Sequence, residues 1–244
     1  MRSSLVLLLA GAAWAQPPAP APIVAPPPLR QAAALINDYG NLARYAGDNQ
    51  KVPAPAPGEE RVVFMGDSIT DGWGRGVKAP FFPGKPYINR GISGQTTAQM
   101  LLRYYPDVVE LKPKAVVILA GTNDIGGNLG PVTLESIENN LAAMSDIARA
   151  NGIRVVLASL TPVCDYHRPQ TAQRPPEKIN ALNRWIKDYC ARNHYVFLDY
   201  FSSTVDNQGF FKSEITNDGL HPNEAGYAIM GPLAQKAIDE ALKQ

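Results

Sequence analysis

The sequence predicts an α/β protein, a three-layer α/β/α sandwich built on a parallel sheet of about five strands. Short apolar runs with the length of buried strands alternate with longer segments whose apolar residues recur at helical spacing. Strands that alternate with helices need right-handed crossovers, which make the strands parallel and place helices on both faces of the sheet. In addition, Gly-rich polar clusters directly follow three of the strands. The expected strands are 61–65, 87–89, 115–120, 153–160 and 195–198.

Four long helices are expected between and after these strands. The pattern is clearest over 133–151, where apolar residues recur at positions 134, 137, 141, 144 and 147 before Gly152. The last helix is expected to begin at Pro222 and to reach about Leu242, and Pro232 inside it is expected to kink or interrupt it. The other two are expected over about 96–105 and through Ile179, Leu182, Ile186 and Tyr189.

The first 58 residues are expected to lie outside the main domain, 59–244. Residues 1–15 combine a basic residue, an apolar run and small residues at the end, which is typical of a cleavable signal peptide. The run is shorter than the about 20 apolar residues that span a membrane, so no stable membrane anchor is expected. Residues 16–28 contain seven Pro and predict an extended linker. Residues 29–58 are interpreted as a helical extension, and the protein is expected to be secreted or periplasmic.

The composition excludes several classes of protein. Hydrophobic residues make up 45% of the chain and charged residues 18%, so the chain can bury a core. Lys and Arg number 23 against 22 Asp and Glu, with no basic block, and nucleic acid is therefore not expected as a partner. Neither metal-binding nor nucleotide-binding spacing is present, so no metal and no cofactor is expected. Cys164 and Cys190 are expected at opposite edges of the sheet, as free thiols.

The cluster after the first strand contains a candidate nucleophile. Ser68 lies on the turn that leads from this strand into a helix. Ester hydrolysis also needs a base and a group that orients the base. His221 precedes the last helix, and Asp218 lies three residues before it, so a tight turn can bring the carboxylate onto the imidazole. The three residues are therefore candidates for a Ser-His-Asp triad.

Two further clusters offer donors for an oxyanion. Gly94 can present a backbone N–H with no side chain in the way, and Asn123 can present its side-chain amide. Ser93 is a rival nucleophile, but the chain contains no Gly-x-Ser-x-Gly elbow, and Ser68 is preferred. Each cluster taken singly also fits an ordinary turn or helix cap. Their joint position at the carboxyl ends of parallel strands favours a catalytic interpretation.

These clusters together resemble the sequence blocks of the GDSL, or SGNH, hydrolase superfamily. The matching segments are Gly66-Asp67-Ser68-Ile69, Gly94, Gly121-Thr122-Asn123-Asp124 and Asp218-Gly219-Leu220-His221. Ile69 stands where the family usually has Leu. The segment around Ser68 and the size of the chain are similar to the branch that includes platelet-activating-factor acetylhydrolase and bacterial acetyl esterases.

The resemblance implies a flavodoxin-like sheet and assigns a role to each candidate residue. Ser68 is implied to be the nucleophile, His221 the base and Asp218 the group that orients the base. The backbone N–H groups of Ser68 and Gly94 and the amide of Asn123 are implied to form the oxyanion hole.

Several neighbouring residues are given structural roles or are left open. Asp67 and Asp124 are expected to stabilise their turns, and His194 is expected to lie at a helix end. Trp73, Phe81 and Phe82 are left open between the wall of an acyl pocket and ordinary packing of their loop. His167 is left open between substrate contact and a solvent-exposed position in its loop.

The expected function is that of a secreted serine esterase that forms an acyl-enzyme and releases a short acyl group, above all acetyl, from a carbohydrate or small-molecule ester. A lipase or thioesterase acting on longer acyl chains would differ only in the depth of its pocket. A non-catalytic binding module on the same scaffold is a further alternative, against which the complete set of five catalytic positions argues.

Overall fold

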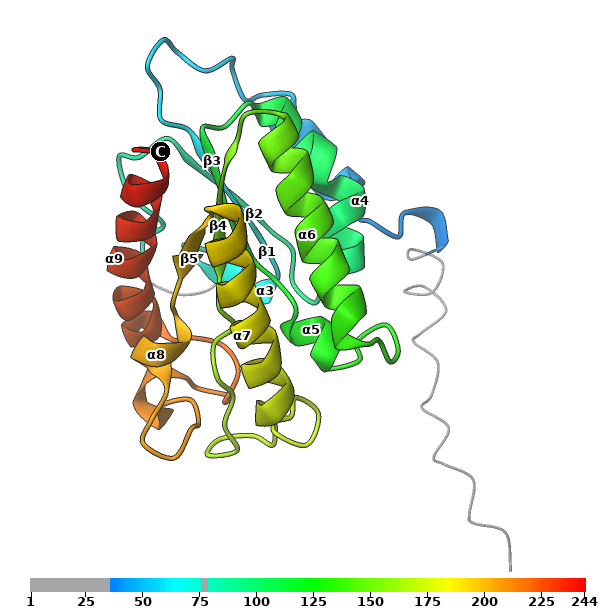
Figure 1. Cartoon of the computed structure of the whole chain (residues 1–244), viewed down its shortest axis with the longest axis vertical. Helices are drawn as coiled ribbons and strands as arrows, with labels where there is room; N and C mark the ends of the chain where they lie inside the picture. The colour runs from blue at the N-terminus through cyan, green and yellow to red at the C-terminus, as the bar shows by residue number, and fades with distance from the viewer. Residues whose placement is uncertain (1–35, 76–78) are drawn as a thin grey trace, which may run out of the picture.

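The computed structural model describes residues 36–75 and 79–244 and has a central sheet between two layers of helices (Figure 1). Its five strands are all parallel and lie in the order β2-β1-β3-β4-β5. This order confirms the expected flavodoxin-like sheet. The strands are β1 (Val62–Gly66), β2 (Tyr87–Gly91), β3 (Ala115–Leu119), β4 (Arg154–Ala158) and β5 (Val196–Leu198).

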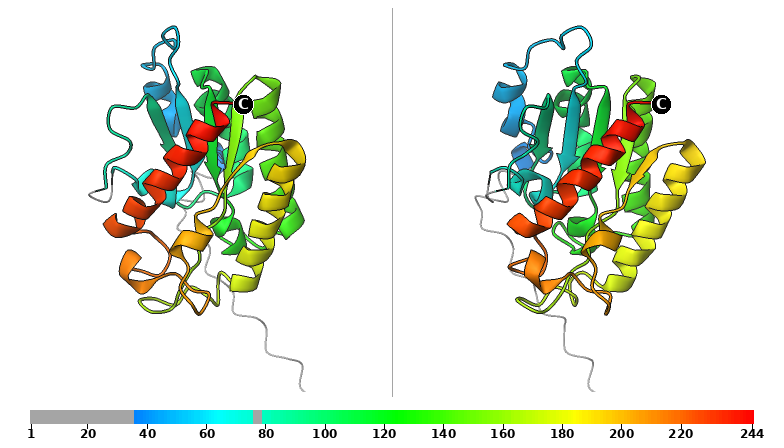
Figure 2. Two further views of the ribbon diagram at one scale, coloured as in Figure 1. Left: turned by 60° about the vertical axis from the view of Figure 1, so that its left-hand side comes forward. Right: turned by 90° about the vertical axis from the view of Figure 1, so that its left-hand side faces the viewer.

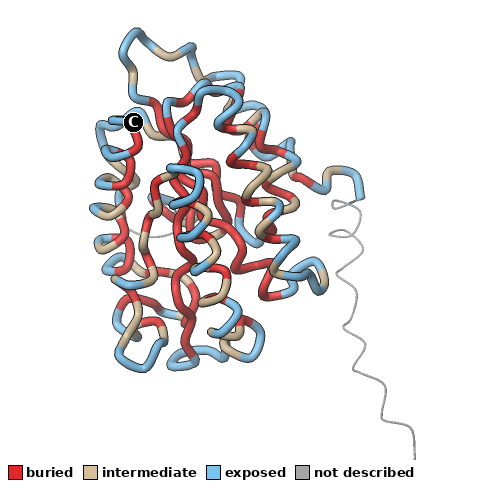
Figure 3. The backbone as a smooth tube through the Cα atoms, viewed as in Figure 1, coloured by how far each residue is buried: buried red, intermediate tan, exposed pale blue. Residues whose placement is uncertain are grey.

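Four long helices cover the two faces of the sheet (Figures 1 and 2). Helices α4 (Thr97–Asp107), α6 (Leu134–Ala150) and α7 (Pro176–Asn193) pack side by side on one face. Helix α9 (Glu224–Ala241) crosses the other face and contacts β3, β4 and β5. Because both faces are covered, every residue of β1 and β3 is buried. Figure 3 shows this buried centre and the exposed outer sides of the helices.

Short helices follow three of the strands at one end of the sheet, the lower end in Figure 1. They are α3 (Ser68–Gly72) after β1, α5 (Thr122–Ile125) after β3 and α8 (Phe201–Thr204) after β5. Two 3₁₀ turns, Val109–Leu111 and Ser213–Ile215, complete the connections. The strand order reverses at β1, since the chain goes from β1 outward to β2 and then back across to β3. The carboxyl end of β1 is therefore the switch point at which ligands bind in sheets of this kind.

The last helix differs from its expected form at two places. It begins at Glu224 instead of Pro222, because the side chain of Asn223 accepts a hydrogen bond from the Gly226 N–H at 3.1 Å and caps the helix there. Pro232 also does not interrupt it. The missing N–H would have bonded to the carbonyl of Ala228, and Ala228 is exposed, so water can take the place of this partner.

At the N-terminal end, the structure describes helix α2 (Ala43–Asn49) within the expected extension 29–58. The carboxylate of Asp38 accepts hydrogen bonds from Leu42 N and Ala43 N at 2.8 and 2.9 Å and stabilises the start of α2. The expected signal peptide 1–15, the linker 16–28 and positions 29–35 lie outside the described residues. Over 36–75 and 79–244, the structure has no helix with the length and apolar character needed to cross a bilayer.

Both cysteines are buried and free, as expected. Cys190 packs in the main core, whereas Cys164 packs with Phe211 and Ile215 in a separate small cluster. The aromatic residues left open by the sequence, Trp73, Phe81 and Phe82, pack in or against the main core. Trp73 and Phe82 have ring centroids 5.1 Å apart, and the cluster continues through Phe64, Phe81, Tyr87 and Tyr227.

Candidate active site

The nucleophile candidate Ser68 begins helix α3 directly after β1. Asp67 caps this helix, because its Oδ1 accepts a hydrogen bond from the Ile69 N–H at 3.0 Å. Ser68 itself is half-buried. The expected turn-stabilising role of Asp67 is thus confirmed.

Ser68, His221 and Asp218 form a continuous chain of hydrogen bonds. Ser68 Oγ lies 2.9 Å from His221 Nε2, and His221 Nδ1 lies 2.7 Å from Asp218 Oδ2. The second oxygen of Asp218 accepts hydrogen bonds from the backbone N–H groups of His221 and Leu220 at 2.8 and 3.0 Å. These hydrogen bonds hold the carboxylate against the imidazole, and His221 lies 153 residues from Ser68 in the sequence.

The surroundings of Asp218 favour its charged form. Burial acts to raise the pKa of Asp218, but the hydrogen bonds donated by His221 and Leu220 outweigh it and hold this pKa below its ordinary value. A carboxylate that stays ionised can stabilise a positive charge on the neighbouring imidazole.

The two donors expected from Gly94 and Asn123 lie on segments that follow the strands β2 and β3. Gly94 adopts a φ of +80° in the loop between β2 and α4, and its carbonyl accepts a hydrogen bond from Asn128 Nδ2 at 3.1 Å. Asn123 is buried in α5, and its Nδ2 donates to the backbone carbonyl of Gln95 at 3.0 Å. This single contact uses one N–H of the Asn123 amide and leaves the other available.

Ser93, the rival nucleophile, is bound to a carboxylate. Its hydroxyl and its backbone N–H both contact Asp71 Oδ2, at 2.8 and 3.2 Å. Asp71 lies one turn after Ser68 in α3, so this contact joins α3 to the loop that carries Gly94. Ser93 therefore has a structural partner, and Ser68 is the serine in contact with a histidine.

The remaining histidines have separate contacts. The ring of His167 lies 2.9 Å from the carbonyl of Ser213 in the loops beyond β4. His194 ends α7 in the left-handed conformation, as expected for a helix end. Asp124 accepts hydrogen bonds from both the N–H and the hydroxyl of Thr97, so it joins α5 to α4 in addition to its own turn.

Two buried charged groups near the triad have unsatisfied atoms. Asp67 Oδ2 and Arg174 Nε have no hydrogen-bond partner in the structure. Burial raises the pKa of Asp67 to about 6, although the charges of His221 and Arg174 oppose this. Sequence reasoning missed Arg174, since a polar loop before a helix contains many such residues and only the fold shows which is buried.

The chain belongs to the GDSL-like lipase/acylhydrolase family, whose model matches residues 64–229. The matched segment contains every triad and oxyanion candidate discussed above. A solved structure of a GDSL-like lipase from Bacteroides thetaiotaomicron is 40% identical, covers 83% of this chain and 99% of its own, and superposes with a TM-score of 0.78. The shared family and fold agree with the resemblance of the four sequence segments.

Two curated relatives extend this comparison. Esterase TesA from Pseudomonas aeruginosa is 30% identical over 135 residues, which are 55% of this chain and 60% of TesA. An acetylxylan esterase from Xylanibacter ruminicola is 26% identical over 238 residues, covering 84% of this chain and 47% of that enzyme. The chain thus spans about half of the length of the acetylxylan esterase and 60% of the length of TesA.

The described residues hold no cluster of three or more His, Cys, Asp or Glu side chains suited to a metal ion.

Proposed function

We propose that this protein is a serine esterase in which Ser68, His221 and Asp218 are the catalytic triad. The observation that carries the proposal is the unbroken contact from Ser68 Oγ through the His221 ring to Asp218, at 2.9 and 2.7 Å. The position of Ser68 at the switch point of the sheet supports it, because ligands bind there.

In the first half of the reaction, Ser68 Oγ attacks the carbonyl carbon of the ester, and His221 Nε2 takes the hydroxyl proton. The ionised Asp218 stabilises the imidazolium that forms. The C–O bond to the alcohol then breaks, and His221 returns the proton to the leaving alcohol. The acyl group remains on Ser68 as an ester.

The negative charge of the tetrahedral intermediate is assigned to three donors: the N–H of Ser68, the N–H of Gly94 and the free N–H of the Asn123 amide. Donors that are held in place before the reaction stabilise this charge without a cost of reorganisation. The contacts of Asn123 with Gln95 and of Gly94 with Asn128 support this role.

In the second half, His221 removes a proton from water, and the resulting hydroxide equivalent attacks the acyl carbon. Collapse of the second intermediate breaks the bond to Ser68 Oγ and returns the proton to the serine. The products are a carboxylic acid and the regenerated enzyme.

The proposed substrates are short-chain esters, acetyl esters above all, of carbohydrates or small molecules. The acetylxylan esterase among the relatives supports acetyl release from a carbohydrate. We further propose export through the signal peptide 1–15, a Pro-rich linker 16–28 and a helical extension 29–58 that precedes the hydrolase domain 59–244.

The purified protein should hydrolyse p-nitrophenyl acetate faster than p-nitrophenyl esters of longer acids, and Ser68→Ala should show no turnover. The wild-type protein should also release acetate from acetylated xylo-oligosaccharides, and Ser68→Ala should not. Preference for long acyl chains would point to a lipase or thioesterase. A folded protein that binds esters without turnover would point to a binding module.

A further inference from the structure

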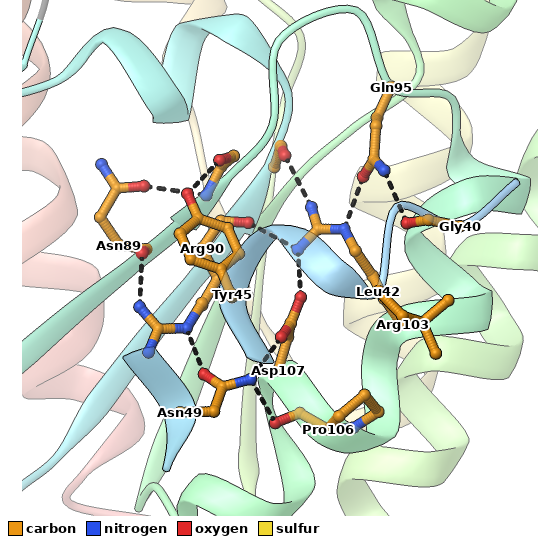
Figure 4. Close-up of polar contacts among 12 residues, drawn as sticks. Gly40, Leu42, Tyr45, Asn49, Asn89, Arg90, Gln95, Arg103, Pro106 and Asp107 are labelled. Carbon is orange, nitrogen blue, oxygen red and sulfur yellow. Dashed lines mark hydrogen bonds and ion pairs between the residues drawn. The ribbon is translucent and has the colours of Figure 1, made fainter. Parts of the chain in front are cut away.

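The loop 91–95, which begins at the last residue of β2 and leads to α4, carries the proposed oxyanion donor Gly94 and is held from several sides. Two of its anchors come from the N-terminal segment 38–49, which lies before the residues matched by the family model. Tyr45 in α2 donates a hydrogen bond from its hydroxyl to the carbonyl of Gly91. Gln95 donates from its Nε2 to the carbonyl of Gly40 at 2.9 Å. Both ends of the loop are therefore bound to this segment (Figure 4).

Arg103 of α4 connects the same loop to the nucleophile strand. Its side chain is completely buried, and its Nε donates to Gln95 Oε1 at 2.5 Å. Its Nη1 donates to the carbonyl of Arg90 at 2.8 Å, and its Nη2 donates to the carbonyl of Gly66 at 3.2 Å. Gly66 ends β1 two residues before Ser68. One rigid guanidinium thus sets the distance between the end of β1, the end of β2 and Gln95.

Helix α2 supplies a further hydrogen-bond donor to the carboxylate that pairs with the buried Arg103. Asp107 Oδ2 accepts a hydrogen bond from Arg103 at 2.9 Å, and Asp107 Oδ1 accepts one from Asn49 Nδ2 at 2.7 Å. Asn49 Oδ1 in turn accepts from Arg90 Nε at 2.9 Å. Buried charges that keep all their partners are held in one geometry, whereas the loss of a partner is costly. The segment 38–49 therefore stabilises one arrangement of Arg103.

The ring of Tyr45 is itself fixed by its surroundings. The guanidinium groups of Arg44, Arg75 and Arg90 lie over it, at 4.7, 5.5 and 4.6 Å from its centroid. Arg75 also donates to the Tyr45 hydroxyl at 3.0 Å and to Asp71 at 2.9 Å. Asp71 in turn accepts a hydrogen bond from Ser93. Tyr45 is therefore connected to the middle of the loop through Arg75 and Asp71, in addition to its direct contact with Gly91.

We propose that the N-terminal segment 38–49 positions the oxyanion hole. Two positioning residues act on loop 91–95: Tyr45 of this segment, and Arg103 of α4, whose arrangement this segment stabilises. The backbone of this loop places the Gly94 N–H, and its Gln95 carbonyl orients the Asn123 amide. The proposal rests on the proposed esterase function. It adds that a segment without any triad or oxyanion residue sets the catalytic rate through the geometry of two donors.

The decisive comparison uses two buried tyrosines. Tyr45→Phe removes the hydroxyl that binds Gly91 and keeps the ring. Tyr104→Phe is the matched control, because the Tyr104 hydroxyl on α4 is buried without a hydrogen-bond partner. Tyr45→Phe is expected to lower kcat about ten-fold with KM nearly unchanged, since small displacements of transition-state donors are costly. Tyr104→Phe is expected to keep the wild-type kcat.

A second readout reports on the oxyanion hole directly. A boronic acid forms a tetrahedral anionic adduct on a catalytic serine, so its Ki should rise by the same factor as kcat falls in Tyr45→Phe. The pH dependence of kcat should stay unchanged, because the triad is intact. Arg103→Lys keeps the positive charge beside Asp107 but loses the several N–H donors of the guanidinium. It should also lower kcat and raise the boronate Ki. A cooperative unfolding transition checks that this variant is folded.

The possible failures are distinguishable. If the wild-type protein hydrolyses no ester, the proposed function is wrong. If the wild type is active, and Tyr45→Phe matches Tyr104→Phe in kcat and boronate Ki, the positioning role is wrong. A Tyr45→Phe protein that is less stable but has wild-type kcat and Ki would likewise show that the segment 38–49 only stabilises the fold.

Discussion

The side-chain amide of Asn123 donates one hydrogen bond to the backbone carbonyl of Gln95, at 3.0 Å. Asn123 lies in α5 after β3, and Gln95 lies in the loop after β2, so the contact joins two of the Gly-rich clusters across the end of the sheet. Because Asn123 is buried and Gln95 is held by Arg103 and Gly40, the orientation of this amide is set before any substrate binds.

Asn123→Ala is therefore expected to lower kcat by about 10²- to 10³-fold with little change in KM, since the amide binds charge that appears only in the transition state. Steady-state kinetics with p-nitrophenyl acetate measures both constants. Asn128→Ala, which removes a side chain bound to the Gly94 carbonyl, should have a smaller effect. An unchanged kcat for Asn123→Ala would assign this residue to the support of the turn alone.

Ser68→Ala is expected to abolish turnover while the protein remains folded, because Ser68 is only half-buried and its hydroxyl contacts the ring of His221, outside the core. The loss of a triad nucleophile costs several orders of magnitude in rate. A fluorophosphonate should label the wild type and Ser93→Ala at Ser68, and should leave Ser68→Ala unlabelled. Mass spectrometry of the labelled peptide locates the adduct, and an adduct on Ser93 would contradict the assignment.

Asp67 is expected to make stability fall as pH rises from about 4 to about 6. Burial raises its pKa in the folded protein from 3.8 to about 6, so the folded state holds a proton that the unfolded state releases. The difference corresponds to about 3 kcal/mol at neutral pH. Asp67→Asn cannot ionise and keeps an oxygen for the Ile69 N–H.

Urea denaturation at pH 4 and pH 8 tests this expectation. Asp67→Asn should gain free energy of unfolding relative to the wild type at pH 8 and should gain little at pH 4. Asp146→Asn, an exposed carboxylate on α6, is the control and should change stability only slightly at both values. Equal effects of Asp67→Asn at the two pH values would show that folding does not raise the pKa of Asp67.

Gly219 is expected to be sensitive to any added side chain. It has a φ of +83° in the turn between Asp218 and His221, and a Cβ there would lie 2.2 Å from the carbonyl oxygen of Cys164. Gly219→Ala should cost about 3 kcal/mol or more and should also lower kcat, because the turn must shift. Gly209, with a φ of +89° and open space around it, is the matched position.

Gly209→Ala should cost only about 1–2 kcal/mol from backbone strain and should keep kcat. Thermal or urea unfolding measures the first effect, and ester hydrolysis measures the second. If the two alanine variants lose the same stability, the close approach of Gly219 to Cys164 does not restrict this turn.

Much of the fold could be predicted because its signals are local. Each strand is a short apolar run, and the helix 134–150 shows its buried stripe in the sequence. The grouping of Ser68, Gly94 and Asn123 followed from the rule that the carboxyl ends of parallel strands share one edge. The boundaries of α9 were less predictable, since they depend on a cap at Asn223 and on the exposed position of Ala228.

The sequence by itself determined the α/β class, the order of the elements and the residue types available for ester hydrolysis, because these follow from periodicity and from residues adjacent in the chain. Only the tertiary structure decided which polar groups meet. The Arg103 guanidinium reaches Gly66 and Gln95, and Tyr45 reaches Gly91, because strand register and helix packing bring together positions that are 37, 8 and 46 residues apart. Such contacts produce no periodic pattern in the sequence. A buried Arg and an exposed Arg look alike in the local sequence, because burial depends on a segment that is distant in the chain and packs over one of them.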